Sequence, residues 1–484
     1  MKKVLSMLLC VLLLCTVFAG CEKRVDSGKV VVCFDIAYGG DYATTDYQEA
    51  ISSFLGWIDD CHKYLNLGIS SEDIEVEIIP GSEEEPAARA STLQRVRAEL
   101  MAGRGPDVFI CKTFSDFFQG GDEFVPMEGG RLFPYVEKIR DSGLFLPLED
   151  LLSEFTVTNP DDLIPGVLDG GKDQNGEQVI LPLAINVPVI MFSGLGYPEC
   201  EFEGTSWDDV LKGDDPVLRE MSVWPMNFFR TSFHANETYI RVGSHGSGLS
   251  YLFPQAADFG EERPYLTEEE LFQTIKDSLD AYRRTLEQET DQNSASIYIT
   301  DIKTNYAGDD WFCPAPAENP YTFVPLRNTE GGSTAVATAY CAVNAYTKQK
   351  EKARDVLDAL LSESNQKGGH LYWFFEGMPV NRNLGGMGFA SHRSGTTQFT
   401  GTQLRDWQRV CDNINIVRFL SPLDTEFNAM MEDVEDALGT YTDEYNLDFV
   451  IRDGRFISGT ISDENLKAII SKHYQAMQRL LDES

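Results

Sequence analysis

The segment that decides the fold runs from Ser91 to Cys111 and reads STLQRVRAELMAGRGPDVFIC. Its first half has a stripe of apolar side chains at helical spacing, formed by Leu93, Val96, Leu100 and Met101. Gly103 is well placed as the C-terminal cap of that helix, because glycine readily adopts the left-handed backbone found there. Gly105-Pro106 marks a turn, and residues 107–111 (Asp-Val-Phe-Ile-Cys) then predict a strand. The segment therefore predicts a helix, a tight turn and a strand in immediate succession.

The residues on the N-terminal side continue the same alternation. Lys29–Tyr38 is a run of β-branched and aromatic residues bounded by glycines, which predicts a buried strand. Asp46–Cys61 has apolar residues at helical spacing, and the alternating Ile74–Ile78 predicts a second strand. Strands that alternate with helices predict a parallel sheet with helices on both faces. Ligands of such sheets bind beyond the carboxyl ends of the strands, which here are residues 38–41 and 112–116.

Three later segments also have clear patterns. Asp169–Gln178 predicts a hairpin turn, because Gly171 and Pro182 occupy the first and last ligand positions of what would otherwise resemble a calcium loop. Glu351–Ser362 and the stretch from Ser462 each carry apolar residues on one face, so both predict amphipathic helices.

The first 21 residues have the layout of an export signal. Lys2 and Lys3 form a positive start, and Val4–Phe18 is apolar but shorter than the about 20 residues that span a membrane. The small residues before Cys21 resemble the bacterial lipobox, in which that cysteine is diacylated, and two acyl chains anchor a protein stably. We predict a signal peptide over 1–20, a lipidated linker over 21–28 and a soluble remainder; the alternative is a plain signal peptide with a coincidental cysteine.

The chain is strongly acidic. It has 40 Lys plus Arg against 77 Asp plus Glu, a formal net charge of -37 over 484 residues. This charge argues against nucleic-acid binding, which depends on Lys and Arg releasing counterions from phosphates. It also argues against a polybasic hold on an anionic membrane, so the lipid at Cys21 is the only membrane contact that the sequence predicts.

The sequence contains no motif of an enzyme, a cofactor site or a metal site. HExxH, GxSxG, P-loop and GxGxxG patterns are absent, and the six histidines lack metal-ligand spacing. Of ten cysteines, Cys10 and Cys15 leave with the signal and Cys21 carries lipid. The others are scattered, odd in number and without a CxxC pair, which favours buried free thiols over a disulfide framework or a zinc site. No catalytic residue, cofactor or metal is predicted.

Six segments, in the correct order along the mature chain, resemble the extracellular solute-binding proteins of carbohydrate ABC importers (the family 1, maltose-binding-like group). They are Arg97–Ile110, Leu146–Leu152, Asn175–Ala184, Thr205–Leu211, Asn344–Gln366 and Gly377–Arg382. Asn175–Ala184 resembles that family's Asn-Gly-Lys-x-Tyr-Gly-x-Pro strand, and Thr205–Leu211 resembles its Pro-x-Thr-Trp-Asp-Glu helix start. The sequence departs from the family pattern over 224–321 and 438–459.

The resemblance implies a two-lobed α/β fold of the periplasmic-binding-protein type, with mixed sheets flanked by helices and a three-segment hinge. Crossovers are expected near Ala184–Val187, Thr322–Arg327 and Glu376–Val380. The N-terminal lobe would comprise 29–185 and 325–377, and the C-terminal lobe 186–324 and 378–484. Such a protein captures a carbohydrate in the cleft, closes around it by hinge motion and delivers it to the permease subunits of an ABC importer. We expect a monomer at the outer face of the membrane.

The resemblance and the positions of the strand ends give eight candidate ligand-binding residues. They are Tyr38, Asp41, Thr113, Phe114, Asn186, Trp311, Trp373 and Phe427. Carboxylates, amides and hydroxyls suit the hydroxyls of a sugar, and aromatic faces suit its CH faces. Each residue also has a plainer interpretation, because the polar ones could order a loop or satisfy hinge backbone groups and the aromatic ones could belong to the core.

Two other functions stay open from the sequence. The same fold could bind a peptide, a polyol or a phosphorylated compound instead of a sugar. An exported glycosidase would show turnover of a glycoside, but abundant acidic pairs in an acidic chain carry no information about that chemistry.

Overall fold

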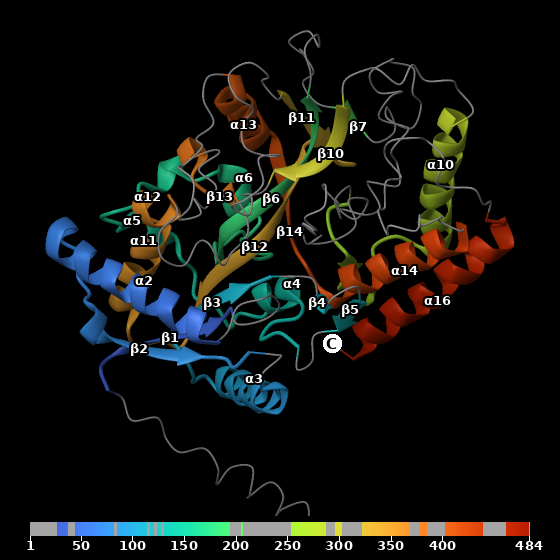
Figure 1. The fold of residues 1–484 in the computed structure, drawn as a ribbon. Helices are drawn as coiled ribbons and strands as arrows, with labels where there is room; N and C mark the ends of the chain where they lie inside the picture. The colour runs from blue at the N-terminus through green and yellow to red at the C-terminus, as the bar shows by residue number, and fades with distance from the viewer. Residues whose placement is uncertain are drawn as a thin grey trace, which may run out of the picture.

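The computed structural model describes residues 27–36, 44–81, 85–113, 117–120, 123–126, 130–193, 205–206, 253–286, 296–302, 322–367, 378–384, 402–438 and 461–483. These residues form a mixed α/β fold in which one large sheet is covered by helices (Figure 1). The predicted fold class, a mixed sheet flanked by helices, is confirmed.

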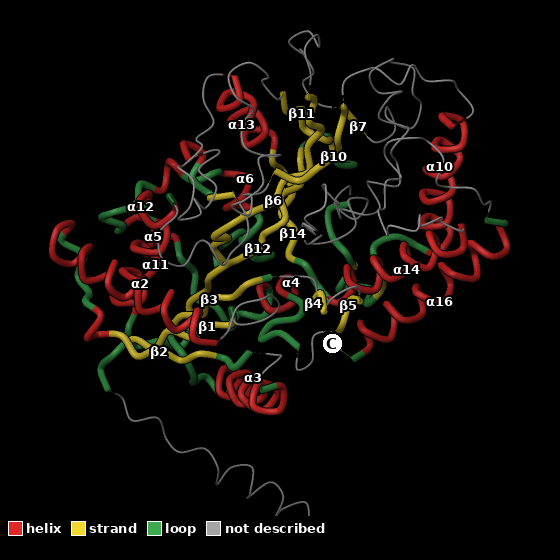
Figure 2. Tube along the Cα trace, viewed as in Figure 1, coloured by secondary structure: helices red, strands yellow, loops and turns green. Residues whose placement is uncertain are grey.

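The described strands form one ten-stranded sheet and two small hairpins (Figure 2). The sheet contains β1 (Val30–Asp35), β2 (Ile74–Ile78), β3 (Val108–Lys112), β6 (Ile180–Ser193), β7 (Thr205–Ser206), β10 (Ser296–Ile302), β11 (Thr322–Arg327), β12 (Ser333–Val343), β13 (Met378–Pro379) and β14 (Ile414–Phe419). The hairpins pair β4 (Phe117–Gly120) with β5 (Glu123–Pro126) and β8 (Ala257–Asp258) with β9 (Arg263–Pro264). The order of the sheet is β10-β6-β11-β12-β3-β1-β2, with β13 beside β6, β14 beside β12 and β7 beside β11.

The helices cover this sheet and extend beyond it. The long ones are α2 (Thr44–Leu65), α3 (Pro86–Met101), α10 (Glu268–Leu286), α11 (Lys350–Leu361), α13 (Thr402–Asn413), α14 (Pro422–Leu438) and α16 (Asp463–Asp482). The short ones are α4 (Val136–Arg140), α5 (Glu149–Ser153), α6 (Pro165–Asp169), α12 (Glu363–Gln366) and the 3-10 turns η1 (Ser71–Asp73), η2 (Pro160–Asp162) and η5 (Arg382–Leu384). Among the described residues, no helix combines the length and the apolar character that crossing a bilayer requires.

The first part of the chain folds as its sequence predicts. β1 lies between β2 and β3 and is parallel to both, with Val30 opposite Ile74 and Val32 opposite Val108. β1 is buried on both faces, which explains its unbroken apolar run. α2 and α3 lie on opposite sides of these strands (Figure 1). α3 ends before Gly103, whose φ of +67° confirms the predicted cap.

Two long strands join the parallel part of the sheet to the rest. β12 is buried along its whole length, and its C-terminal half runs antiparallel to β3. Its N-terminal half runs parallel to β14. β6 runs antiparallel to β12 over its first residues and then continues between β10 and β11. β6 therefore crosses from one set of partners to another within a single strand.

The segment α13–β14 packs on the same core as β1 and β3. Trp407 and Phe419 are buried in that hydrophobic cluster. Gly166 of α6 lies so close to β14 that a Cβ atom there would be 1.9 Å from the Ile414 carbonyl oxygen, so only glycine fits. The chain thus returns to this core after β13, within the 378–484 range that the sequence analysis places in the C-terminal lobe. The lobe boundaries stay a prediction.

Buried charged residues fix the loops around the sheet. Asp35 and Arg89 form an ion pair of 2.6 Å in which both side chains are at most 1% exposed. Arg89 also donates to the carbonyl oxygens of Pro80 and Gly130, and Asp35 accepts a hydrogen bond from the Leu132 amide. The pair is tolerated in the core because these hydrogen bonds replace the lost water.

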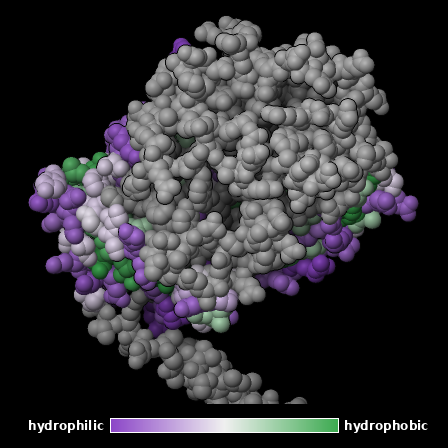
Figure 3. Space-filling view, in the orientation of Figure 1, coloured by the Kyte–Doolittle hydropathy of each residue, from purple (hydrophilic) through white to green (hydrophobic). Residues whose placement is uncertain are grey.

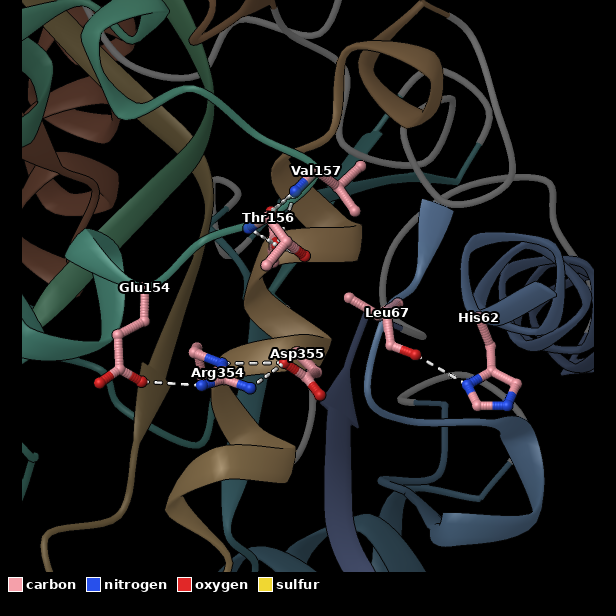
Figure 4. Close-up of polar contacts among 8 residues, drawn as sticks. His62, Leu67, Glu154, Thr156, Val157, Arg354 and Asp355 are labelled. Carbon is pink, nitrogen blue, oxygen red and sulfur yellow. Dashed lines mark hydrogen bonds and ion pairs between the residues drawn. The ribbon is translucent and has the colours of Figure 1, made fainter. Parts of the chain in front are cut away.

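α11 is fixed to the neighbouring loop in the same way. Figure 4 shows Thr156 and Val157 beside α11, where their backbone amides donate to the buried Asp358 carboxylate. It also shows Arg354 between Glu154 and Asp355. The predicted apolar stripe of α11 is buried. The buried Asp358 carboxylate adds hydrogen bonds between α11 and the neighbouring loop to this apolar packing.

The turn over residues 169–178 is a tight hairpin connection, as predicted. The Asp173 carboxylate accepts hydrogen bonds from the backbone amides of Asn175 and Glu177, and the Asp173 carbonyl accepts from Gly176. Lys172 and Gln178 form an antiparallel bridge across it. The carboxylate therefore orders its own loop, as Asp commonly does in turns.

α14 and α16 pack side by side and share a buried histidine. The His473 side chain is 5% exposed, with Nδ1 2.6 Å from Glu426 and Nε2 2.9 Å from Asp433 of α14. Burial by itself would lower the pKa of His473, but the hydrogen bonds to these two carboxylates outweigh it and raise the pKa. His473 thus joins the two helices through hydrogen bonds to carboxylates at both ring nitrogens.

Candidate functional site

The candidate site lies where β6 changes partners. Ala184 is paired with Ala339 of β12 on one side and Pro379 of β13 on the other, whereas Val187 is paired with Ile302 of β10. Asn186 sits between these two sets of pairs. Its side chain is fully buried, and neither its amide oxygen nor its amide nitrogen has a hydrogen-bond partner among the residues that the structure describes.

An unpartnered buried amide is unusual. Most buried polar side-chain atoms are hydrogen-bonded, and each exception costs about 1–3 kcal/mol. An amide offers both a donor and an acceptor, so Asn186 can bind a group that has both functions, such as a hydroxyl. The geometry therefore favours an external polar group at this position.

The three predicted crossover segments meet on this one strand. Asn186 lies in the first of them. β11 spans the second, and its residues Thr322–Pro325 pair with Phe192–Val189 of β6. β13 is the described part of the third, and Met378 pairs with Ile185 of β6. Segments that are far apart in the sequence are thus hydrogen-bonded to β6 on either side of Asn186.

Lys112 and Thr113 bring the carboxyl end of β3 to the same region. Lys112 pairs with Ala339, which in turn pairs with Ala184, so the Lys112 and Asn186 side chains belong to the same face of the sheet. Lys112 is 2% exposed. The Thr113 amide donates to the Thr338 carbonyl, and the Thr113 hydroxyl donates to Ala337. The Thr113 hydroxyl is therefore engaged within the protein, and its contact with a ligand stays a prediction.

Sequence reasoning missed a second unpartnered polar group in this region. The Thr338 hydroxyl is fully buried, and no described residue forms a hydrogen bond with it. It lies on β12 next to Ala339, on the opposite face from Asn186. A threonine within a wholly buried strand carries no sequence signal that separates it from its apolar neighbours.

Phe427 lines a separate small cavity. This cavity has a volume of about 40 Å³ and is bounded by the β8–β9 hairpin, α14 and α16, with Asn186 not among its lining residues. The buried ion pair of Arg418 and Asp424 also lines it. A cavity of this volume is large enough to hold water.

The other predicted positions lie outside the described residues. They are Cys21, Tyr38, Asp41, Phe114, Trp311 and Trp373. Their roles stay predictions.

The described cysteines and histidines offer no reactive centre. Cys33, Cys61, Cys111, Cys341 and Cys411 are all free and buried, as the sequence predicts. Burial raises the pKa of each thiol, to about 12 for Cys61, so the nucleophilic thiolate is scarce at neutral pH. Both ring nitrogens of His473 are occupied by carboxylates. Among the residues that the structure describes, no His, Cys, Asp and Glu group is placed to hold a metal ion.

The chain is similar to solved structures but not, in sequence, to characterised families. No family model matches it, and no curated protein matches it. It is similar to an extracellular solute-binding protein of family 1 from Alicyclobacillus acidocaldarius, at 11% identity and a TM-score of 0.49, over 94% of this chain and 100% of the other. Solute-binding proteins of this kind are among the structures that the chain resembles.

Two further similar structures differ in kind. A periplasmic oligogalacturonide binding protein from Yersinia enterocolitica is 11% identical, with a TM-score of 0.46, over 94% of this chain and 99% of the other. A de novo designed cysteine esterase is 11% identical, with a TM-score of 0.44, over 94% of this chain and 100% of the other.

Proposed function

We propose that this chain is an extracytoplasmic solute-binding lipoprotein that captures a carbohydrate and delivers it to an ABC importer. Binding would occur between two lobes that meet at β6, with no chemical change to the bound molecule. The acylated Cys21 would hold the protein, as a monomer, at the outer face of the cell membrane.

The observation that carries this proposal is Asn186. A fully buried amide with neither atom hydrogen-bonded is costly in the empty protein. A sugar hydroxyl can accept from the amide nitrogen and donate to the amide oxygen, so binding would remove that cost. The same group would discriminate against ligands without a hydroxyl there, because the amide would stay unpaired.

The position of Asn186 suits a ligand that controls closure. The three predicted crossovers pair with β6 on both sides of it. A ligand shifts an equilibrium between open and closed forms only by its differential affinity for the two. Asn186 lies on the proposed hinge strand. If the bound molecule also touches both lobes, its contact with Asn186 contributes to this difference in affinity between the open and closed forms. An oligosaccharide has hydroxyls along its length and suits such a cleft.

The test is ligand binding by thermal shift and calorimetry over a panel of mono- and oligosaccharides. We expect one oligosaccharide to bind, and the radius of gyration from solution scattering to decrease on binding. Asn186→Leu should weaken binding at least tenfold, whereas Asn186→Asp, which keeps the acceptor, should retain part of it. Asn175→Ala, in the exposed turn, is the matched control and should bind normally.

Three outcomes would contradict the proposal. If no sugar binds but a peptide or polyol does, the protein is a binder of another solute. If a chromogenic glycoside is hydrolysed and one carboxylate substitution abolishes turnover, the protein is an exported glycosidase. If Asn186→Leu binds the sugar as tightly as the unmodified protein, the ligand lies elsewhere.

A further inference from the structure

The amino ends of the parallel strands gather four separate segments at one edge of the molecule. We call residues 27–30, 62–73, 101–107 and 344–352 the amino edge. The Lys352 ammonium is 2.7 Å from the Gly28 carbonyl oxygen and 2.9 Å from the Asp73 carboxylate. The Asn344 amide donates to the Arg104 carbonyl at 3.0 Å. α2 ends at this edge, where His62 is bonded to the Leu67 carbonyl (Figure 4).

The amino edge carries every large apolar side chain that is exposed among the described residues. They are Tyr64, Leu65, Met101 and Tyr346, which are 67%, 43%, 72% and 57% exposed. Figure 3 shows hydrophobic patches enclosed by hydrophilic surface at the left end of the molecule, where α2 ends in Figure 1. Apolar side chains collected on one face of an otherwise hydrophilic protein indicate a contact surface.

The charge of the amino edge is opposite to that of the chain. Its exposed cations are Lys29, Lys63, Arg104, Lys348 and Lys350, and its exposed acids are Glu72 and Glu351, with the exposed Asp59 at its border accepting from Ser71. None of these five cations forms an ion pair within the described residues, although Lys63 lies over the Tyr64 ring at 4.7 Å. The chain as a whole has 40 Lys plus Arg against 77 Asp plus Glu. A positive surface has therefore been kept on a strongly negative protein.

The predicted lipid anchor leads directly to this edge. β1 begins at Val30, nine positions after Cys21, with eight residues between them. An extended chain spans at most about 3.5 Å per residue, so the amino edge stays within about 30 Å of the anchored cysteine. No other edge of the sheet is tied so closely to the anchor.

We infer that the amino edge is a membrane-contact surface that rests on the anionic bilayer to which Cys21 is anchored. This inference rests on the lipid anchor of the proposed function. Tyrosine side chains favour the interface between lipid and water, and lysine extends an apolar stem along the surface while its charge meets the lipid phosphates. The acidic remainder of the chain is repelled from the same bilayer, which orients the protein.

The orientation has a consequence for the candidate site. β1 and β3 are parallel, so their carboxyl ends lie opposite the amino edge. With that edge on the bilayer, the carboxyl end of β3, where Lys112 lies, is on the side away from the membrane. The protein is then held with its candidate binding region open to the solution from which it captures solute.

The test is hydrogen–deuterium exchange of the full, acylated protein reconstituted in lipid vesicles. We expect residues 62–73, 101–107 and 344–352 to exchange at least severalfold more slowly on vesicles with 30% phosphatidylglycerol (roughly bacterial in anionic content) than on pure phosphatidylcholine. The protection should fall with added salt, because exposed charges are screened. The triple variant Lys63→Gln, Lys348→Gln and Lys350→Gln should lose it.

The matched control changes three exposed cations elsewhere, Lys367→Gln, Lys467→Gln and Arg479→Gln, and should keep the protection. Equal exchange on the two kinds of vesicle, or equal loss in both triple variants, overturns the inference. So does protection that appears only when the importer is added, which would make this edge a protein-docking surface. Intact mass reports acylation of Cys21, and sugar binding by the Lys63 triple variant reports the proposed function, so each can fail separately.

Discussion

Two buried asparagines at opposite ends of the sheet differ completely in their surroundings. Asn344 follows β12 at the amino edge and is 2% exposed; it donates to the carbonyls of Arg104 and Pro106 and accepts from the Tyr346 amide. The Asn186 side chain is fully buried in β6 and forms no hydrogen bond within the described part of the chain. The same side chain therefore closes a turn in one place and is left unpartnered in the other. Burial alone does not distinguish these two amides, whereas their hydrogen bonds do.

The largest expected change in the free energy of unfolding comes from breaking the buried, fully hydrogen-bonded ion pair at the carboxyl end of β1. Arg89→Met would leave Asp35 charged in the core and two carbonyl oxygens without a donor. Removal of one partner of a buried pair costs about 3–5 kcal/mol. Urea unfolding should show this loss. Lys367→Gln, which removes an exposed pair with Glu363, is the control and should cost about 0.5 kcal/mol or less. A loss below about 1 kcal/mol for Arg89→Met would show that the pair contributes little.

The next largest change in the free energy of unfolding is expected for Asn344, the asparagine whose side chain is fully hydrogen-bonded. Asn344→Ala removes three hydrogen bonds and leaves the carbonyl groups of Arg104 and Pro106 and the Tyr346 amide unpaired or dependent on water. We expect the free energy of unfolding to fall by about 2–4 kcal/mol. Binding of the ligand by the folded variant should be unchanged. A variant that is as stable as the parent would show that water replaces the amide without cost.

Asn186 should behave in the opposite way. Asn186→Leu replaces an unpaired buried amide by an apolar side chain of similar size. The free energy of unfolding should stay constant or rise by about 1 kcal/mol, while ligand affinity falls. The two measurements on one variant separate a binding role from a structural one. A destabilisation of about 2 kcal/mol or more would place Asn186 with Asn344 as a structural residue.

The smallest expected change in the free energy of unfolding concerns His473, a buried titratable side chain with both ring nitrogens hydrogen-bonded. Its pKa is raised in the folded protein, because the hydrogen bonds to Glu426 and Asp433 outweigh burial. A raised pKa gives stability that is complete below the unfolded pKa of about 6.5 and is lost as pH rises through the folded value. Unfolding of the protein should therefore become easier above about pH 6.5. His473→Gln should flatten this part of the profile of unfolding free energy against pH, and an unchanged profile would assign the dependence to other groups.

Local pattern accounts for much of the fold. The helix, turn and strand over Ser91–Cys111 were predictable because apolar spacing, a glycine at positive φ and a proline turn act within a few residues of each other. β1, β2 and α11 follow in the same way from their runs and stripes. The bounds of α2 were not predictable, since its observed ends extend beyond the apolar stripe on both sides.

The candidate site was predictable only as a position. The resemblance of Asn175–Ala184 to a hinge strand placed Asn186 near a ligand, and the structure puts it between two sets of strand partners. Its lack of a partner could not be predicted, because that depends on β10, β12 and β13, which come from distant parts of the chain. Thr338 was missed for the same reason, and Phe427 lies in a cavity that three distant elements enclose.

By itself the sequence determined the net charge and the alternation that produces a mixed α/β fold, and it predicted an export signal ending at Cys21. The net charge of the whole chain argued against a basic membrane contact. A total over all residues, however, does not reveal a local positive surface. Only the tertiary structure gathered Lys29, Lys63, Arg104, Lys348 and Lys350 at one edge. The physical reason is the topology: parallel strands must all begin at the same edge of a sheet, and the antiparallel β12 must end there, so loops distant in sequence become one surface.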